Sequence, residues 1–291
     1  MINGILNIYK EPGMTSFQVV SRVRRIVGEK KCGHTGTLDP EAEGVLPICL
    51  GRATKIVEYL TDRKKTYRAQ LKLGVVTDTQ DSSGRILEER DPSYVTEEVF
   101  RARLSEFEGD QLQVPPMVSA LKVNGKRLYE LAREGITVER AARPVTFYSI
   151  GILKLNLPYA EIEVTCSKGT YIRTLIHDLG TKLGCGAIMT HLVRTAVGSF
   201  REQDAIRLSE LEKIVEEGRL DQVMTGVDLF FHELGEYRCL PEEDRIVHNG
   251  NFLHLQAGGE RIRVYDSLGK FIGIYQKSST DSCYKPEKMF L

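Results

Sequence analysis

The chain has 291 residues, of which 41% are hydrophobic, so it can bury the core of one large domain, or of a large and a small one. Its 40 basic residues balance 40 acidic ones, so a local patch rather than net charge would have to hold a polyanion. No apolar run approaches the roughly 20 residues that cross a bilayer, and no signal peptide is evident. We therefore expect a cytoplasmic protein that does not engage a membrane.

The six cysteines are scattered without a C-x-x-C pair. This spacing argues against a zinc site and against a disulfide framework. We expect reduced thiols, most of them buried.

A short apolar strand, Ile5 to Tyr9, is expected near the start of the chain. The next segment has the spacing of an amphipathic helix, with Thr15 or Ser16 as N-cap and Gly28 as its stop. Its expected apolar face consists of Phe17, Val20, Val23 and Val27.

Residues 33–47, GHTGTLDPEAEGVLP, place one aspartate, Asp39, in a loop rich in glycine. Glycine permits backbone conformations closed to other residues, and Pro40 disfavours the helical region for Asp39. The carboxylate is therefore expected to be positioned by the backbone. Taken alone, an aspartate before proline also fits a turn or a helix start, so both interpretations stay open at this point.

Residues 66–74 alternate as a strand does, with Tyr67 near its start, and residues 77–84 are typical of a polar turn. A second amphipathic helix is expected within residues 95–109. Its expected inward side chains are Val99, Phe100, Leu104 and Phe107. Residues 113–145 break the pattern with two prolines and several basic residues, and we interpret them as an insertion projecting from the core.

In the remainder of the large unit, segments with the apolar period of a strand alternate with segments that have the period of a helix. Strands are expected at residues 145–155, 160–166 and 192–200, and helices at 169–184 and 208–218. We expect Ser209 and Glu212 to form a capping box at the start of the last helix. Mixed elements of this kind predict an α+β fold with an antiparallel-rich central sheet flanked by helices.

From about Gly235 the sequence pattern changes to short segments typical of strands, two of which are joined by a turn at residues 267–269. A shift of this kind marks a domain boundary. We expect a catalytic domain at residues 1–235, which includes the insertion, and a small β-rich domain at residues 236–291.

Several site classes find no support in the sequence. There is no G-x-S-x-G elbow, no phosphate loop ending in G-K-[ST], no H-x-x-x-H spacing and no calcium loop. No metal site is expected, and any chemistry would rest on a lone carboxylate with aromatic and basic helpers.

Four long motifs together resemble the TruB family of tRNA pseudouridine-55 synthases. The resemblance runs from about residue 3 to residue 200, with the motifs in family order. The motifs are GHTGTLDPEAEGVLP, KTYRAQLKLG, PPMVSALKVNGKRLYELAREG and CSKGTYIRTLIHDLGTKLG.

The resemblance implies an isomerase, without a cofactor, that detaches a uracil from its ribose and rejoins it through carbon. It implies that Asp39 is the catalytic carboxylate. A buried lone carboxylate tends to protonate, so we expect Arg173 to pair with Asp39 and keep it charged. Tyr67 matches the family's active-site tyrosine, whose ring can stack on the extruded uracil and whose hydroxyl can help remove the C5 proton.

By the same resemblance His34 fills the gap left by the extruded base, and Tyr171 and Leu192 line the uracil pocket. Three basic residues, Lys10, Lys168 and Arg194, are expected near the phosphates or at the pocket floor. The family's opening usually has adjacent lysine and proline, whereas Glu11 here separates Lys10 from Pro12.

The insertion corresponds to the family's mobile element that closes over the T-arm of tRNA, and a PUA-like RNA-binding domain usually occupies the C-terminal position. We expect a monomer without an obligate protein partner. Alternatives are an RNA chaperone of the same fold without essential catalysis, an enzyme for another RNA assembled with partner proteins, and a metal hydrolase. The intact Asp39, Tyr67 and Arg173 set argues against the first, and the lack of basic tails against the second.

Overall fold

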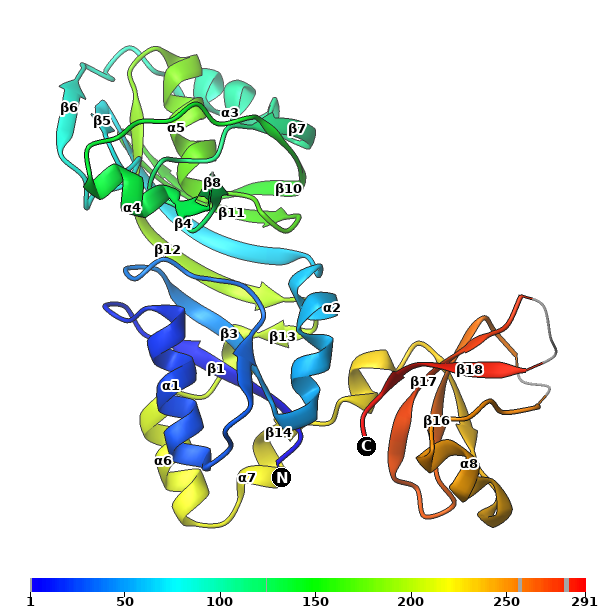
Figure 1. Ribbon diagram of the computed structural model, residues 1–291. Coiled ribbons are helices and arrows are strands. Elements are labelled where there is room, and N and C mark those ends of the chain that lie inside the picture. Colours follow the sequence, from blue (N-terminus) through cyan, green and yellow to red (C-terminus); the bar gives the residue numbers. More distant parts are fainter. Residues whose placement is uncertain (1, 124, 256–257, 280–282) are drawn as a thin grey trace.

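The computed structural model describes residues 2–123, 125–255, 258–279 and 283–291. A large mixed sheet runs through the body of the molecule (Figure 1). Its described pairings are antiparallel except for β12 with β3, which confirms the α+β class. In spatial order its strands are β14 (Met224–Thr225), β1 (Gly4–Lys10), β3 (Glu43–Leu50), β12 (Ala187–Val197), β4 (Lys65–Leu73), β11 (Tyr159–Cys166), β10 (Arg143–Asn156) and β7 (Gly109–Gln113), with β2 (Cys32–His34) beside β3 and β13 (Phe200–Arg201) beside β12.

Helices cover the sheet in two groups, one at each end of the body (Figure 1). The first group packs Val23 of α1 and Leu211 of α6 against apolar residues of β1 and β3. The second packs Phe100 of α3 and Leu175 of α5 against β4, β11 and β12. The helical segments of the body are α1 (Ser16–Val27), η1 (Gly51–Ile56), α2 (Val57–Thr61), α3 (Glu97–Ser105), α4 (Leu128–Arg133), α5 (Ile172–Leu183), η2 (Glu202–Asp204), α6 (Leu208–Glu216), α7 (Leu220–Val223) and η3 (Asp228–Phe231).

The first helix begins and ends as the sequence indicates, but one residue of its expected apolar face is wrong. Thr15 is the N-cap and accepts from the Gln18 amide, while Gly28 closes the helix in the left-handed conformation. Phe17 is 73% exposed, whereas the other three expected residues are buried. Ser16 and Val19 take the inward positions instead, because the helix is rotated to present Ser16 to the loop of Asp39.

Two further expectations need correction. Val99 in α3 is 45% exposed, since Phe100 and Leu104 already fill the contact with the core. The capping box of α6 does not use Ser209 and Glu212. The N-cap is Arg207, two residues earlier, and its amide donates to the Glu210 carboxylate at 2.7 Å.

Two small hairpins project from the body. The strands β5 (Val75–Thr77) and β6 (Ile86–Glu89) flank the polar turn that the sequence predicts. In the segment interpreted as an insertion, β8 (Lys122–Val123) pairs with β9 (Lys126–Arg127), and the short helix α4 follows directly. This segment therefore lies between β7 and β10, the last two strands of the large sheet.

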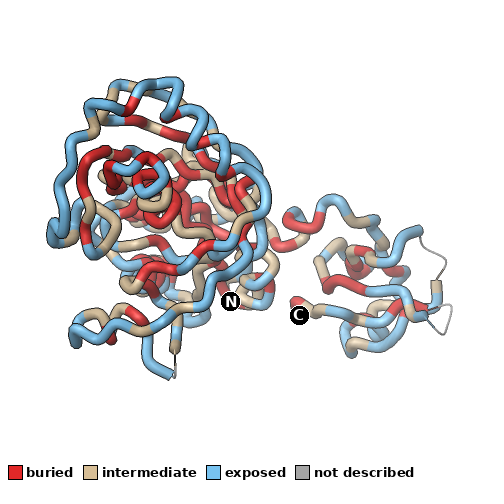
Figure 2. Tube along the Cα trace, turned by 90° about the horizontal axis from the view of Figure 1, so that it is seen from above, coloured by how far each residue is buried: buried red, intermediate tan, exposed pale blue. Residues whose placement is uncertain are grey.

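The C-terminal part forms its own sheet, as the sequence indicates. It has the order β15 (Gly235–Arg238), β16 (Arg261–Tyr265), β17 (Phe271–Lys277) and β18 (Tyr284–Met289), with η4 (Pro241–Glu243) and α8 (Asp244–His248) beside it. Figure 2 shows a separate set of buried positions within this part. Its end contacts the body: Phe290 is buried with Ile56 and Leu60, and the Lys55 ammonium donates to the Met289 carbonyl at 2.8 Å.

None of the helices in the described ranges is long and apolar enough to cross a membrane. The cysteines are free thiols, all buried except the partly buried Cys32.

The close approach of β3 to β12 depends on a glycine. Gly44 has a φ of +105°, and a Cβ there would lie 2.3 Å from the Arg194 carbonyl oxygen. Gly28 also has a positive φ, +69°, but nothing lies within 4 Å of its Cβ position. A side chain at Gly28 would therefore cause backbone strain alone, whereas a side chain at Gly44 would cause strain and a steric clash.

We expect Gly28→Ala to lower the free energy of unfolding by about 1 kcal/mol, the cost of a left-handed alanine. Gly44→Ala should lose roughly 2 kcal/mol more, because β3 and β12 must move apart to admit the methyl group. Denaturant unfolding of both variants measures the difference. Equal losses would show that the contact with Arg194 adds nothing.

Candidate active site

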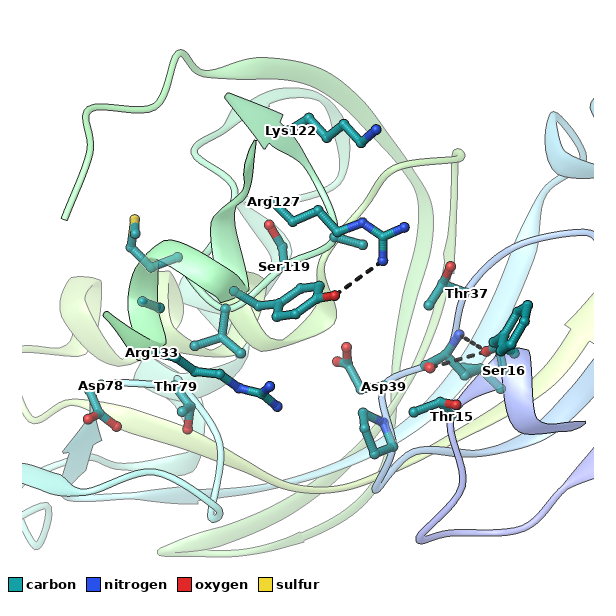
Figure 3. A pocket seen from close by; sticks show the side chains of 18 of the residues that line it. Thr15, Ser16, Thr37, Asp39, Asp78, Thr79, Ser119, Lys122, Arg127 and Arg133 are labelled. Carbon is teal, nitrogen blue, oxygen red and sulfur yellow. Dashed lines mark hydrogen bonds between the residues drawn. The ribbon is translucent and has the colours of Figure 1, made fainter. Parts of the chain in front are cut away.

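A cavity of about 1250 Å³ lies between the Asp39 loop and the segment 113–145. In Figure 3, Asp39, Thr15 and Ser16 occupy one side, while Arg127 and Lys122 approach from the other. Asp78 and Thr79, from the turn after β5, complete the wall. The cavity is therefore assembled from segments far apart in the sequence.

Arg173, a buried residue in the first turn of α5, contacts Asp39 directly. Its Nη2 lies 3.0 Å from the Asp39 Oδ2, so the expected ion pair is present. The same guanidinium lies 3.3 Å from the Asp81 carboxylate and donates to the carbonyls of Thr79 and Val118, each at 3.0 Å. One cation thus joins the Asp39 loop, the turn after β5 and the insertion.

The charge on Asp39 is set by opposing effects. Burial raises the pKa of Asp39 above its ordinary value; Arg173 opposes this, and the neighbouring Asp81 carboxylate adds to it. The sequence leads us to expect that Arg173 keeps Asp39 charged; the ion pair is present, but burial and Asp81 outweigh it, so the pKa stays above its ordinary value. The side chain still keeps 42% of its surface accessible, because the carboxylate faces the cavity.

The loop that carries Asp39 is fixed by side chains beneath it. Ser16 Oγ accepts from the Leu38 amide at 2.9 Å and donates to the Leu38 carbonyl at 3.2 Å. The fully buried Lys10 donates to the carbonyls of Pro40, at 2.8 Å, and Ala42, at 2.5 Å. The backbone on both sides of Asp39 is therefore held in place.

Arg194 braces the same loop from β12. It is buried, and its guanidinium donates to the carbonyls of Gly36 at 3.1 Å and Val45 at 2.7 Å. The burial of Lys10 and Arg194 argues against phosphate contact, and neither lines the cavity; both hold the Asp39 loop from beneath. Lys168 is exposed and pairs with Asp62 at 2.6 Å, and it does not line the cavity.

The two expected aromatic residues, Tyr67 and Tyr171, lie close enough to Asp39 to feel its charge, but neither is among the residues that line the cavity. Tyr67 is buried on β4 beside Arg194, and burial raises its pKa to about 12, so its hydroxyl stays protonated. Tyr171 precedes α5, and the Gln113 side chain bonds both its amide and its carbonyl, at 2.8 and 3.0 Å. The Asp39 charge acts on both tyrosines.

His34 lines the cavity, and Leu192 does not. The Nδ1 of His34 accepts from the Gly36 amide at 3.3 Å, and burial lowers the pKa of the ring, which favours its neutral form. Leu192 is packed in the core that also contains Tyr67.

Three contributors were not identified from the sequence. The sequence pattern marks Ser16 only as a possible helix cap and Asp81 only as part of a polar turn. Gln80 in that turn has a φ of 65°, unusual for a residue other than glycine, and its Oε1 accepts from Thr174 Oγ1 at 2.9 Å. Only the polar spacing of residues 77–84 hinted at this role.

Within the described part of the chain, no group of three or more histidine, cysteine, aspartate or glutamate side chains is placed to hold a metal ion. The arrangement instead presents a single carboxylate, oriented by a guanidinium, to a wide cavity with basic side chains on its far wall. Such a site can act on a nucleoside within a polyanion.

Comparison with known proteins identifies the class as a pseudouridine synthase. Residues 24–172 match the model of the TruB family pseudouridylate synthase N-terminal domain, and residues 173–231 match the tRNA pseudouridylate synthase B C-terminal domain. The chain therefore belongs to the TruB family of tRNA pseudouridine synthases.

Similar curated proteins extend over the full length. The tRNA pseudouridine synthase B of Clostridium perfringens is 43% identical over 307 residues, covering 100% of this chain and 99% of that protein. The protein of the same name from Clostridium tetani is 45% identical (95% and 96% covered), and that from Bacillus pumilus 44% identical (99% and 98% covered).

Solved structures agree with the fold. A structure of a Cbf5-Nop10-Gar1 complex has a chain with a TM-score of 0.72 and 27% identity, covering 99% of this chain and 85% of that one. An H/ACA RNP bound to a substrate RNA containing 2'-deoxyuridine gives a TM-score of 0.71 at 24% identity, with the same coverage.

Ser16 and Thr15 allow a matched test of the loop anchor. Ser16→Ala removes both bonds to Leu38 and leaves a buried amide without a partner, which costs about 1–3 kcal/mol of stability. Thr15→Ala removes only the helix cap, at a cost of about 1 kcal/mol.

The distinguishing measurement is hydrogen exchange at the Leu38 amide. It should accelerate in Ser16→Ala beyond the effect of the lost global stability, and not in Thr15→Ala. Unchanged protection of Leu38 in Ser16→Ala would contradict the anchoring role.

Proposed function

We propose that this enzyme converts uridine to pseudouridine at position 55 in the T-loop of tRNA, with Asp39 as the catalytic carboxylate. The observation that carries the proposal is the 3.0 Å ion pair of Asp39 with the buried Arg173, which aims one oriented carboxylate into a cavity of about 1250 Å³. Family membership and the tRNA-modifying names of the relatives support the substrate class.

The reaction needs the target nucleotide out of its stack, at a cost of a few kcal/mol. The bond from C1′ to N1 breaks, the base turns, a bond from C1′ to C5 forms, the C5 proton passes to solvent, and N1 takes up a proton, so the product is an isomer of uridine. Asp39 acts on the nucleoside at C1′, at C6 or at the 2′ proton, while Tyr67 stacks on the uracil and, with its hydroxyl protonated, takes part in the final proton transfer through neighbouring groups. The neutral His34 suits the space vacated by the base.

The insertion supplies the RNA-holding wall. Lys122, Arg127 and Arg133 line the cavity opposite Asp39, as Figure 3 shows. The Val118 carbonyl of the same segment is bonded to Arg173, so a clamp on the T-arm would be linked mechanically to the catalytic pair. Contacts of this kind with phosphates make affinity fall with salt.

The proposal includes a catalytic domain at residues 1–235 and a PUA-like RNA-binding domain at residues 236–291. The separate four-stranded sheet with its own buried cluster supports this division. The enzyme acts as a cytoplasmic monomer, without an obligate protein partner.

Tritium release from C5-labelled uridine in an unmodified tRNA transcript tests the function. The wild type should release label, and Asp39→Asn should lose at least about 10³-fold in rate, because position 39 no longer carries an ionised carboxylate. A transcript with the T-loop uridine replaced should release nothing. Binding of the transcript by both proteins, with release by neither, would establish an RNA chaperone instead.

The pH dependence follows from the raised pKa of Asp39. The ionised form is the active one, so kcat/KM should fall tenfold per pH unit as the pH drops through a midpoint clearly above ~4, the ordinary value of an aspartate. Single-turnover rates between pH 4.5 and 8 measure this midpoint. If the rate does not change over that whole range, burial does not raise the pKa of Asp39.

A further inference from the structure

Phe17 is the one expected core residue of α1 that lies open to solvent, with 73% of its surface exposed. It also lines the cavity that contains Asp39. Single exposed apolar side chains are common on protein surfaces, but this ring lies on the wall of the cavity of Asp39, where it can contact a ligand that enters.

The position of the ring is fixed by its neighbours. Ser16, the preceding residue, is bonded at 2.9 Å to the Leu38 amide, which locks the first turn of α1 against the Asp39 loop. Thr15 and Gln18 form the capping box that completes this turn. Because successive helical residues are about 100° apart, locking Ser16 inward turns Phe17 outward.

The cavity is larger than one nucleoside requires. Its volume of about 1250 Å³ exceeds the roughly 300–1,000 Å³ of a site for one small molecule. Basic side chains of the insertion, Lys122, Arg127 and Arg133, line the opposite wall. An RNA backbone held on that wall would present unstacked bases toward α1.

We propose that the Phe17 ring is a stacking platform for a nucleobase of the RNA loop other than the target uridine. The inference rests on the proposed function, because the RNA enters the cavity of Asp39. Stacking on an aromatic ring is a common way to hold splayed bases, and it tolerates any base because each has a π-face. Phe17 is thus a positioning residue for the substrate loop, and it takes no part in the bond changes.

The variants Phe17→Ala, Phe17→Leu and Phe17→Tyr separate the possibilities. Loss of one base stack should weaken tRNA binding by about 5- to 150-fold in Phe17→Ala, with Phe17→Leu nearly as weak and Phe17→Tyr close to wild type. The single-turnover rate at saturating tRNA should change less than about threefold, so the loss appears in KM. The melting temperature should not fall, since the side chain is mostly exposed.

Tyr159→Ala is the matched control. Tyr159 is another aromatic residue with 53% of its surface exposed, and it does not line the cavity. Its removal should leave both binding and rate unchanged.

Abasic substitution at each loop nucleotide identifies the partner. One abasic transcript should bind wild type as weakly as intact tRNA binds Phe17→Ala, and combining the two changes should add little further loss. If every abasic transcript loses affinity additively with Phe17→Ala, the ring packs on the protein's own insertion and the proposal is wrong. It is also wrong if Phe17→Leu binds like wild type.

The slope of affinity against salt adds a second criterion. Phe17→Ala should leave the slope unchanged, whereas removal of a phosphate-binding cation reduces it by about one. Failure of the proposed function would look different, because the wild type itself would then release no label from the transcript.

Discussion

The buried guanidinium of Arg173 is the contact on which the site depends. A buried cation is tolerated only when partners surround it, and here two carboxylates and two carbonyls do so. These partners come from the Asp39 loop, the turn after β5 and the insertion. Their relative positions are therefore coupled, and a shift of the insertion at Val118 would move Arg173 and with it the Asp39 carboxylate. The site is a junction of segments rather than a feature of one loop.

The same logic explains why basic residues around the site are difficult to interpret from sequence. Lys10 and Arg194 look like phosphate-binding residues in a protein that acts on RNA, yet both are buried and donate to backbone carbonyls of one loop. Burial lowers the pKa of Lys10 to about 8, because its surroundings disfavour a charge. The sequence shows that a basic side chain is present, but only the structure shows which groups that side chain contacts.

The elements themselves were largely predictable, since apolar periodicity reports which face of a segment meets the core. The sequence pattern did not predict the central strand β3 or the helical segments η1 and α2, and it placed the start of β12 five residues too late. The other errors fall at helix ends and at the edges of apolar faces. Phe17 and Val99 fit the spacing but lie outward, because Ser16 and Phe100 compete for the inward positions. Ser209 has the residue type of a cap, but the backbone places Arg207 there. At such positions a tertiary contact decides, and the sequence pattern carries no information about it.

Substrate entry makes the Arg173 arrangement more important. The Asp39 side chain keeps 42% of its surface accessible to water, and a nucleoside in the cavity would remove much of that hydration. Desolvation already raises the pKa of Asp39, and the loss of water would raise it further. The counterion must then be in place before the substrate arrives, since no solvent remains to stabilise a displaced charge. The bonds of Arg173 to Thr79 and Val118 meet that requirement, because they hold the guanidinium independently of Asp39.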